Sequence, residues 1–395
     1  MIKLIKYLLL IFITSSSMNG QTTSLYLKKV YENHPGIIAG RELLNSKEAE
    51  TRTGLTPENP VISGGYFPGK PVEIGDKTTW SITQSLDFPT KYSKLKALKK
   101  TNFDLAALEF ESYSLMLMTE ARDYTIRLVN DRENLTLMQK RLNHFQSLEI
   151  AYRKMLEKGE STIIEYNKVM IRLANIRSIV SELENSISSN LMILDYFSNG
   201  SSGLLENADY PLFGDLHPDS LFFEKGSSHP AYLIPGTRID ASRKNIQLSK
   251  TGNLPGIDLG YGSESVGGEA FTGPSLGITI PIWKNRGKVK AAEAETGFMV
   301  AEAEREILLL KSELTDNIRS CKAVKTNLDE IIKTVDQSDN RIFLKDALEA
   351  GEISMGNYII ELTAYYEIED TMITLEKRYY LLLSMIFDHR FPGIF

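Results

Sequence analysis

Two residue types that commonly build metal and redox sites are scarce in this sequence. Among 395 residues there is one cysteine, Cys321, and there are five histidines. A single cysteine excludes an intramolecular disulfide, and no two histidines have the i, i+4 spacing of a helical zinc site. No nucleophile and base can be recognised as a pair either. We therefore expect no metal site, no cofactor and no enzymatic activity.

Two further absences concern nucleic acid and membrane-spanning helices. Lys and Arg number 45 against 51 Asp and Glu, so the net charge of −6 offers no basic excess for nucleic acid. After residue 20 no apolar run reaches about 18 residues, so any part inside a membrane would have to consist of strands. With 42% hydrophobic residues the chain can still bury a sizeable core.

The N-terminus has the pattern of an export signal. Lys3 and Lys6 precede an apolar run over residues 7–13, and small or polar residues follow up to Gly20. This run is too short to span a bilayer, so we expect residues 1–20 to be a signal peptide that directs export. A buried N-terminal helix is the alternative interpretation.

Matching motifs divide the chain into two similar halves. His34-Pro35 corresponds to His229-Pro230 at an offset of 195 positions, and segment 156–160 corresponds to 348–352 at an offset of 192. Further pairs with offsets of 195 and 196 lie between them in the same order. We interpret the chain as an internal duplication. Residues 21–200 form the first repeat, 201–228 a linker, and 229–395 the second repeat.

Each repeat predicts the same series of elements. An opening helix is followed by two strands, one very long helix without proline, a glycine turn and a return helix. At 1.5 Å per residue each long helix would extend about 90–100 Å. The expected ranges are 24–53, 60–68, 78–88, 91–158 and 161–197 in the first repeat, and 230–251, 255–262, 275–283, 286–350 and 354–388 in the second.

Apolar and polar side chains alternate along the expected strands. The apolar set is Trp80, Ile82, Leu86, Leu276, Ile278 and Ile280, and the polar set is Ser81, Thr83, Ser85, Asp258 and Thr279. A period of two predicts strands with one apolar and one polar face. A soluble two-sheet sandwich would show the same alternation, but four strands alone could neither close nor hide their edges.

Apolar residues in the long helices recur at alternating steps of three and four. The pattern runs from Val300 through Cys321 to Ile342, and residues between Leu135 and Leu156 repeat it. A repeat of 3.5 residues is typical of left-handed coiled-coil packing. We therefore expect these helices to pack against other helices.

The order of elements and two motifs resemble the TolC family of outer-membrane efflux proteins. Residues 276–287, LGITIPIWKNRG, are similar to that family's strand running into P-(aromatic)-x-x-(R)-G. Residues 348–354, LEAGEIS, are similar to its Y-x-x-G-x-(I/A)-S turn, with Leu348 in place of the aromatic residue. The resemblance implies a mainly α fold with a small β part. It would be an internally duplicated long-helix α-barrel, with four strands per chain contributing to a trimeric 12-stranded transmembrane β-barrel.

The resemblance also implies a function and partners. The chain would be a passive homotrimeric duct in the cell outer membrane, with a long periplasmic extension, in a tripartite efflux or secretion system. Its partners would be a periplasmic adaptor (membrane fusion) protein, an inner-membrane pump and outer-membrane lipid. The polar set of strand residues would line the barrel lumen and the apolar set would face lipid. Segments 67–77 and 262–274 would be external loops.

By the same resemblance, the two helical turns would form the periplasmic entrance and dock the adaptor. The turn residues are Leu156, Gly159, Glu160 and Ser161 in the first repeat, and Leu348, Gly351, Glu352 and Ser354 in the second. Glu165 stands where the family often has an acidic gate residue, Asn357 is its second-repeat counterpart, and Glu361 lies one turn further on. A carboxylate ring from three chains would favour cations. The alternative is that Glu165 is an ordinary solvated helix residue.

Two other classes of function compete with a channel. An exported coiled-coil structural or interaction protein would account for the heptads, but not for the alternating strands or the duplication. A secreted enzyme would need catalytic residues that the sequence does not offer. For a channel, the sequence leaves drugs, metal cations and peptides open as cargo.

Overall fold

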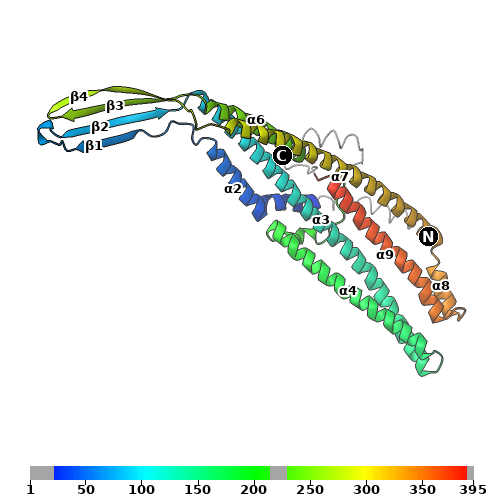
Figure 1. Cartoon of the computed structure of the whole chain (residues 1–395). Coiled ribbons are helices and arrows are strands. Elements are labelled where there is room, and N and C mark those ends of the chain that lie inside the picture. The colour runs from blue at the N-terminus through cyan, green and yellow to red at the C-terminus, as the bar shows by residue number, and fades with distance from the viewer. Residues whose placement is uncertain (1–21, 214–228, 389–395) are drawn as a thin grey trace. The chain divides into compact units, whose positions relative to one another are not determined.

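The computed structural model of the chain describes residues 22–213 and 229–388 (Figure 1). The expected signal peptide, residues 1–20, and residues 214–228 of the expected linker lie outside the described residues. The chain divides into two compact units, each of which takes segments from both sequence repeats. Unit 1 comprises Met1–Ala39, Tyr113–Phe222 and Lys311–Phe395, and unit 2 comprises Gly40–Ser112 and Phe223–Leu310.

Unit 2 contains a four-stranded antiparallel sheet. Its strands β1 (Val61–Phe67), β2 (Lys77–Leu86), β3 (Gly256–Val266) and β4 (Glu269–Thr279) are neighbours in that order. The connection from β1 to β2 includes the short 3-10 helix η1 (Val72–Ile74). Gly267 and Gly268 connect β3 to β4, and their φ values of 59° and 97° suit a two-residue hairpin turn. Strands from the two sequence repeats pair where β2 meets β3.

The strands of the second repeat differ from the expected ranges. β3 and β4 cover most of residues 262–274, so the prediction of a loop there is wrong. Glycines at 262 and 273 hide the alternation, because a residue without a side chain adds nothing to a hydrophobic pattern. β4 also ends at Thr279, so Ile280 lies one residue beyond the strand. Pro281 follows, and it has no N–H to continue the ladder.

The opening helix expected over residues 24–53 is in fact two helices. One covers residues 22–33, and α2 (Pro35–Glu50) begins at a proline, which cannot donate the next helical hydrogen bond. The buried His34 lies between them, and its Nδ1 accepts from the Gly36 N–H at 3.0 Å. His229 caps α6 (Pro230–Thr251) in the same way, accepting from the Ala231 N–H at 3.2 Å. The two matching histidines therefore have equivalent structural roles.

Polar contacts join the helices of unit 2. This unit holds α6, most of α2, and the first parts of α3 (Thr90–Glu157) and α7 (Lys288–Ser338). Arg238 of α6 pairs with Glu306 of α7 at 3.1 Å and with Glu109 of α3 at 3.4 Å. Each of these partly exposed ion pairs contributes only about 0–1 kcal/mol to the stability of the fold. They join α6 to α3 and to α7 at defined helix faces.

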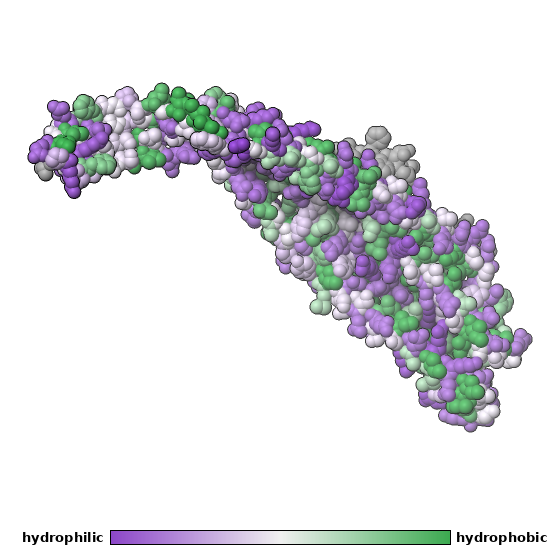
Figure 2. Space-filling model, in the orientation of Figure 1, coloured by the Kyte–Doolittle hydropathy of each residue, from purple (hydrophilic) through white to green (hydrophobic). Residues whose placement is uncertain are grey.

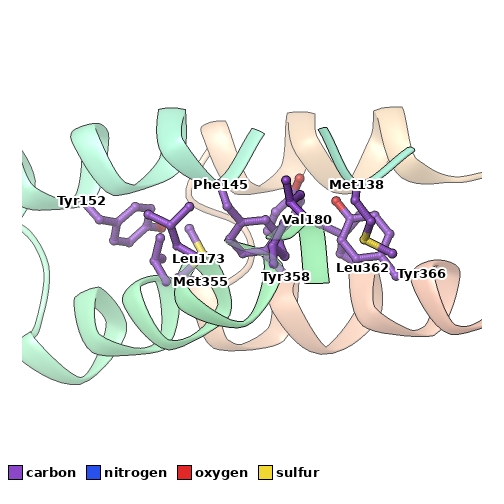
Figure 3. Close-up of a cluster of buried hydrophobic side chains, with 11 residues drawn as sticks. Met138, Phe145, Tyr152, Leu173, Val180, Met355, Tyr358, Leu362 and Tyr366 are labelled. Carbon is purple, nitrogen blue, oxygen red and sulfur yellow. The ribbon is translucent and has the colours of Figure 1, made fainter. Parts of the chain in front are cut away.

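Unit 1 is helical, and its core confirms the heptad interpretation. Met138, Phe145 and Tyr152 of α3 are spaced by seven residues and are all buried. They point towards side chains of α4 (Ile163–Ser198) and α9 (Met355–Ile386), as Figure 3 shows. A second cluster packs Leu314, Ile318 and Cys321 of α7 against the C-terminal end of α9. Among the described residues, no helix combines the length and hydrophobicity needed to cross a membrane.

The second long helix, expected over 286–350, is interrupted. α7 ends at Ser338 and the short helix α8 (Arg341–Glu349) follows, so the prediction of one continuous helix is wrong. Tyr365 of α9 bonds to both ends of the break: its hydroxyl donates to the Ser338 carbonyl at 2.8 Å and accepts from the Asn340 N–H at 3.2 Å. The Asp339 carboxylate also accepts from the Arg341 N–H at 3.2 Å. Side chains thus replace the helical hydrogen bonds at this point.

The described part of the expected linker packs against the helices of unit 1. It contains the 3-10 helix η2 (Ser202–Leu205). Tyr210 stacks on Tyr380 of α9 with ring centroids 4.0 Å apart, and Asn130 of α3 donates to the Tyr210 hydroxyl at 3.1 Å. These contacts hold residues 202–210 against α3 and α9.

Candidate functional site: a two-faced sheet and two helical turns

The sheet of unit 2 has one apolar and one polar face. In antiparallel strands, residues directly opposite one another lie on the same face. Ile82 is opposite Tyr261, and Leu86 is opposite Ile257, which is opposite Ile278. One face therefore holds the predicted residues Trp80, Ile82, Leu86, Leu276 and Ile278, and the other holds Ser81, Thr83, Ser85, Asp258 and Thr279. The alternation in the sequence thus places ten of the eleven strand residues correctly; Ile280 lies outside β4.

The apolar face is largely uncovered in the single chain. Leu276 is 70% exposed and Ile278 is 66% exposed. Figure 2 shows hydrophobic residues gathered over β3 and β4, towards the end of the sheet where the helices of the same unit begin. Moving one such side chain from water into an apolar environment is favourable by about 1.5–3 kcal/mol. A contiguous exposed apolar face of this kind marks a surface that contacts lipid or another protein.

Hydrogen bonds cross the polar face from strand to strand. The Ser85 hydroxyl donates to Asp258 at 2.6 Å, and the Thr279 hydroxyl donates to the same carboxylate at 2.9 Å. Ser63 and Ser81 share a hydrogen bond of 2.8 Å between β1 and β2. These bonds connect all four strands and hold the Asp258 carboxylate in one orientation.

The polar face is lined with small residues. Along β2 and β3 its residues are mostly less exposed than those of the apolar face, although most are small. Gly260 and Gly262 belong to it, and a Cβ at Gly262 would lie 2.7 Å from the Trp80 carbonyl oxygen. A Cβ at Gly260 would overlap the Ser275 hydroxyl. Glycine in a strand often marks a place where another part of the chain approaches closely, as it does at these two positions.

The two edges of the sheet have free backbone groups. β1 pairs only with β2, and β4 pairs only with β3, within the described residues. Unpaired strand edges are templates for further strands, and natural proteins cover them or close them. The sheet is therefore suited to joining other sheets edge to edge.

The two helical turns of unit 1 have the same backbone geometry. After α3, the Gly159 N–H donates to the Leu156 carbonyl and the Glu160 N–H donates to the Met155 carbonyl. After α8, Gly351 and Glu352 donate to Leu348 and Ala347 in the same pattern. This is the Schellman arrangement, in which the glycine takes a left-handed conformation. All eight predicted turn residues lie at or beside these two turns.

Glu165 completes a capping box at the start of α4. Its carboxylate accepts from the Thr162 N–H at 3.1 Å and from the Ser161 hydroxyl at 3.0 Å, and its own N–H donates to Thr162 Oγ1. The Thr162 backbone bond is the main reason that the pKa of Glu165 lies below its usual value. The sequence pattern Thr-x-x-Glu before a helix is the signature of such a capping box. The second repeat has half of this box, since Ser354 caps the Asn357 N–H at 3.2 Å.

Exposed apolar residues beside the turns were missed by the sequence analysis. Ile163 and Ile164, the first residues of α4, are 55% and 66% exposed. Ile342 and Phe343 are also exposed, but they lie at the start of α8, at the opposite end of this helix from its turn. In the sequence, Ile163 and Ile164 are a pair of large apolar residues directly after the capping residue Thr162. Asn357 and Glu361, predicted at the entrance, are exposed on α9 within the single chain.

A buried arginine holds α3 to α9 behind the turns. Arg141 donates to Glu369 and to Asp370, both at 2.8 Å, and to the Tyr366 carbonyl at 3.1 Å. Nearby, a hydrogen bond of 3.0 Å joins His144 of α3 to the Tyr358 hydroxyl of α9. Burial and the neighbouring Lys345 lower the pKa of His144. Within the described residues, no cluster of three or more His, Cys, Asp or Glu side chains could hold a metal ion.

The chain has the fold of solved bacterial outer-membrane channels. A membrane protein from Pseudomonas aeruginosa superposes with a TM-score of 0.80 at 14% identity, covering 93% of this chain and 89% of that one. The outer-membrane channel OprN gives 0.78 at 13%, covering 93% and 89%. The CmeC outer membrane channel of Campylobacter jejuni gives 0.77 at 14%, covering 93% and 85%.

This likeness confirms the fold that the resemblance to the TolC family predicts, namely long helices with a small four-stranded sheet. No protein-family model matches the sequence. No curated protein matches it.

Proposed function

We propose that the chain forms the outer-membrane channel of a tripartite efflux or secretion system, as a passive homotrimeric duct. Three copies would join their sheets into one 12-stranded barrel, which would pair the free edges of β1 and β4. The apolar face would contact outer-membrane lipid and the polar face would line a water-filled lumen. The observation that carries this proposal is the separation of an exposed apolar face from a polar face of small residues.

The helical turns would form the periplasmic entrance and dock a periplasmic adaptor. The exposed Ile163 and Ile164 support this assignment, because apolar residues at a helix start are available to pack against a partner helix. Glu165, Asn357 and Glu361 would lie at the entrance. An inner-membrane pump would supply the energy, so the chain itself performs no catalytic step.

Paired cysteine substitutions on β2 test the lumen assignment. Thr83→Cys would place a thiol on the polar face and Ile82→Cys would place one on the apolar face. The native Cys321 is buried, and burial raises the pKa of its thiol to about 11, so it should not react. In planar lipid bilayers, a charged methanethiosulfonate reagent should reduce the conductance of the Thr83→Cys protein and leave that of Ile82→Cys unchanged. Equal responses would contradict the assignment of the two faces.

Fractionation separates this proposal from an exported coiled-coil scaffold. A channel should stay with the outer membrane after a high-salt wash and should run as a detergent-resistant trimer. A scaffold should wash out and should not conduct ions in a bilayer.

A further inference from the structure

A strip of unpaired positive charge follows the sheet. Beyond β4, Ile282 and Trp283 are 65% and 78% exposed. The next four charged residues, which we call the basic strip, are Lys284, Arg286, Lys288 and Lys290. All four are exposed, and none makes an ion pair within the part of the chain that the structure describes.

The first repeat has a similar run of charge after its own second strand. Residues 91–100 contain five lysines, and the next acidic residue is Asp104. Three of these lysines have partners, such as Lys91 with Asp87 at 2.5 Å. Lys96 and Lys100 are exposed and make no ion pair among the described residues. Both helices that follow a strand therefore begin with positive charge only.

Local helix energetics do not explain these charges. The N-terminal end of a helix carries a partial positive charge and favours acidic residues, yet neither α3 nor α7 has an acidic residue in its first turn. Further along α7, three of the six basic residues make ion pairs, Arg305 with Glu302, Arg319 with Asp316 and Lys325 with Asp329. None of the four residues of the basic strip has such a partner among the described residues.

We infer that the basic strip is a binding surface for anionic phospholipid headgroups. The inference rests on the proposed function, because it requires the apolar face of the sheet to lie in a membrane. Trp283 then stands at the boundary between lipid and water, where tryptophan is enriched. The basic residues directly after it would lie at the level of the headgroups. The positive charge of the basic strip is complementary to the negative charge of these headgroups. Each Lys or Arg near an anionic membrane surface raises the binding constant about fivefold.

Tryptophan fluorescence can measure this preference. The chain has two tryptophans, Trp80 and Trp283, so a Trp80→Phe background leaves Trp283 as the only probe. The full chain is reconstituted into vesicles in which either phosphatidylglycerol or phosphatidylcholine carries brominated acyl chains. The quenching of Trp283 by each lipid gives the relative binding constant of the anionic over the zwitterionic lipid. We expect this constant to exceed 1 and to fall in high salt.

A matched pair of variants locates the preference. The first variant should lower the relative binding constant severalfold towards 1; it carries Lys284→Gln, Lys288→Gln and Lys290→Gln. The control variant removes the same charge from exposed positions further along α7 and should leave the constant unchanged; it carries Lys311→Gln, Lys322→Gln and Lys333→Gln. The inference would be overturned if the relative binding constant were 1 for the protein with its native basic strip, or if it decreased equally in both variants. Either result would leave the channel proposal intact. No quenching by either brominated lipid would instead overturn membrane insertion, and with it the proposed function.

Discussion

Gly159 and Gly351, which lie 192 positions apart, adopt the same left-handed backbone conformation, with φ values of 76° and 75°. Each follows a helix and is followed by a glutamate whose N–H closes the same hydrogen bond to the carbonyl five residues earlier. The repeat seen in the sequence is therefore also a repeat of backbone geometry at the two turns. The equivalent caps made by His34 and His229 agree with it.

Replacing either turn glycine by alanine should destabilise the helical unit. A left-handed conformation costs a residue with a Cβ about 1–2 kcal/mol. No atom lies within 4 Å of a Cβ placed at either position, so the cost should come from the backbone conformation alone. Chemical unfolding followed by circular dichroism would measure the decrease in the free energy of unfolding.

Gly297→Ala is the matched control for the turn glycines. Gly297 lies inside α7, has no positive φ, and a Cβ there also meets no atom within 4 Å. Because alanine favours the helix over glycine by about 1 kcal/mol, this change should stabilise the protein. Equal effects at Gly159 and Gly297 would contradict the role assigned to the turn.

Glu165 has two possible roles, and two substitutions separate them. Glutamine can serve in a capping box as glutamate does, so Glu165→Gln should leave helix stability nearly unchanged. If the carboxylate contributes to the entrance, the same change should reduce the preference for cations, or the block by divalent ions, in a reconstituted channel. Reversal potentials in asymmetric salt would measure the preference.

Glu165→Ala removes the carboxylate half of the capping box as well as the charge, while the Thr162 hydroxyl can still accept from the backbone N–H of residue 165. It should lower the free energy of unfolding by about 0.5–1.5 kcal/mol, the usual net contribution of a hydrogen bond. A Glu165→Gln channel with unchanged selectivity and block would leave the capping box as the only role of this residue.

The sequence predicted regular features well and local exceptions poorly. Heptad spacing identified the buried stripe of α3, because every seventh residue from Met138 to Tyr152 faces its neighbours. Alternation assigned the faces of β2, where Trp80, Ile82 and Leu86 share one face and Ser81, Thr83 and Ser85 the other. It failed over residues 262–274 of β3 and β4, where glycine and serine carry too little hydrophobic contrast. The heptad pattern did not reveal the break in the helix before Arg341, because that break depends on Tyr365 from a distant part of the chain.

The close approach of β2 to Gly262 of β3 predicts that this position cannot accept a side chain. A Cβ at this position would lie 2.7 Å from a backbone oxygen, which cannot move without disturbing the pairing of β2 with β3. Overpacking of this kind typically costs about 1–3 kcal/mol. Gly262→Ala should therefore lower the free energy of unfolding measured in urea.

Gly64→Ala provides the comparison, since its Cβ would meet only the Thr79 carbonyl oxygen at 3.6 Å, an ordinary contact. It should change the stability little. If both alanine variants were as stable as the native chain, there would be more room at Gly262 than the structure indicates.

Arg141 should be among the most sensitive residues of the helical unit. Its side chain is 5% exposed, and its removal would leave the partly buried Glu369 without one of its two cationic partners, the other being Arg341. Breaking a buried ion pair from one side costs about 3–5 kcal/mol. Arg141→Met should lower the thermal midpoint accordingly, as followed by circular dichroism.

Arg319→Ala breaks an ion pair whose side chains are 81% and 58% exposed, so it should cost less than about 1 kcal/mol. Comparing Arg141→Met with Arg319→Ala tests whether burial of the ion pair determines the loss of stability. Similar losses of stability in the two variants would contradict this.

His144 should make the helical unit less stable in mild acid. Burial and the nearby Lys345 hold its pKa below the ordinary value of 6.5, so the folded chain favours the neutral imidazole more than the unfolded chain does. Its contribution to stability is therefore fully present above pH 6.5. It is lost as the pH falls through the lowered pKa, because protonation would place a cation next to Lys345. Unfolding experiments at pH 7.5 and pH 5 should show a smaller decrease for His144→Gln than for the native chain. Glutamine can keep the hydrogen bond to Tyr358 without taking up a proton, so an identical decrease in both proteins would assign the acid sensitivity to other groups.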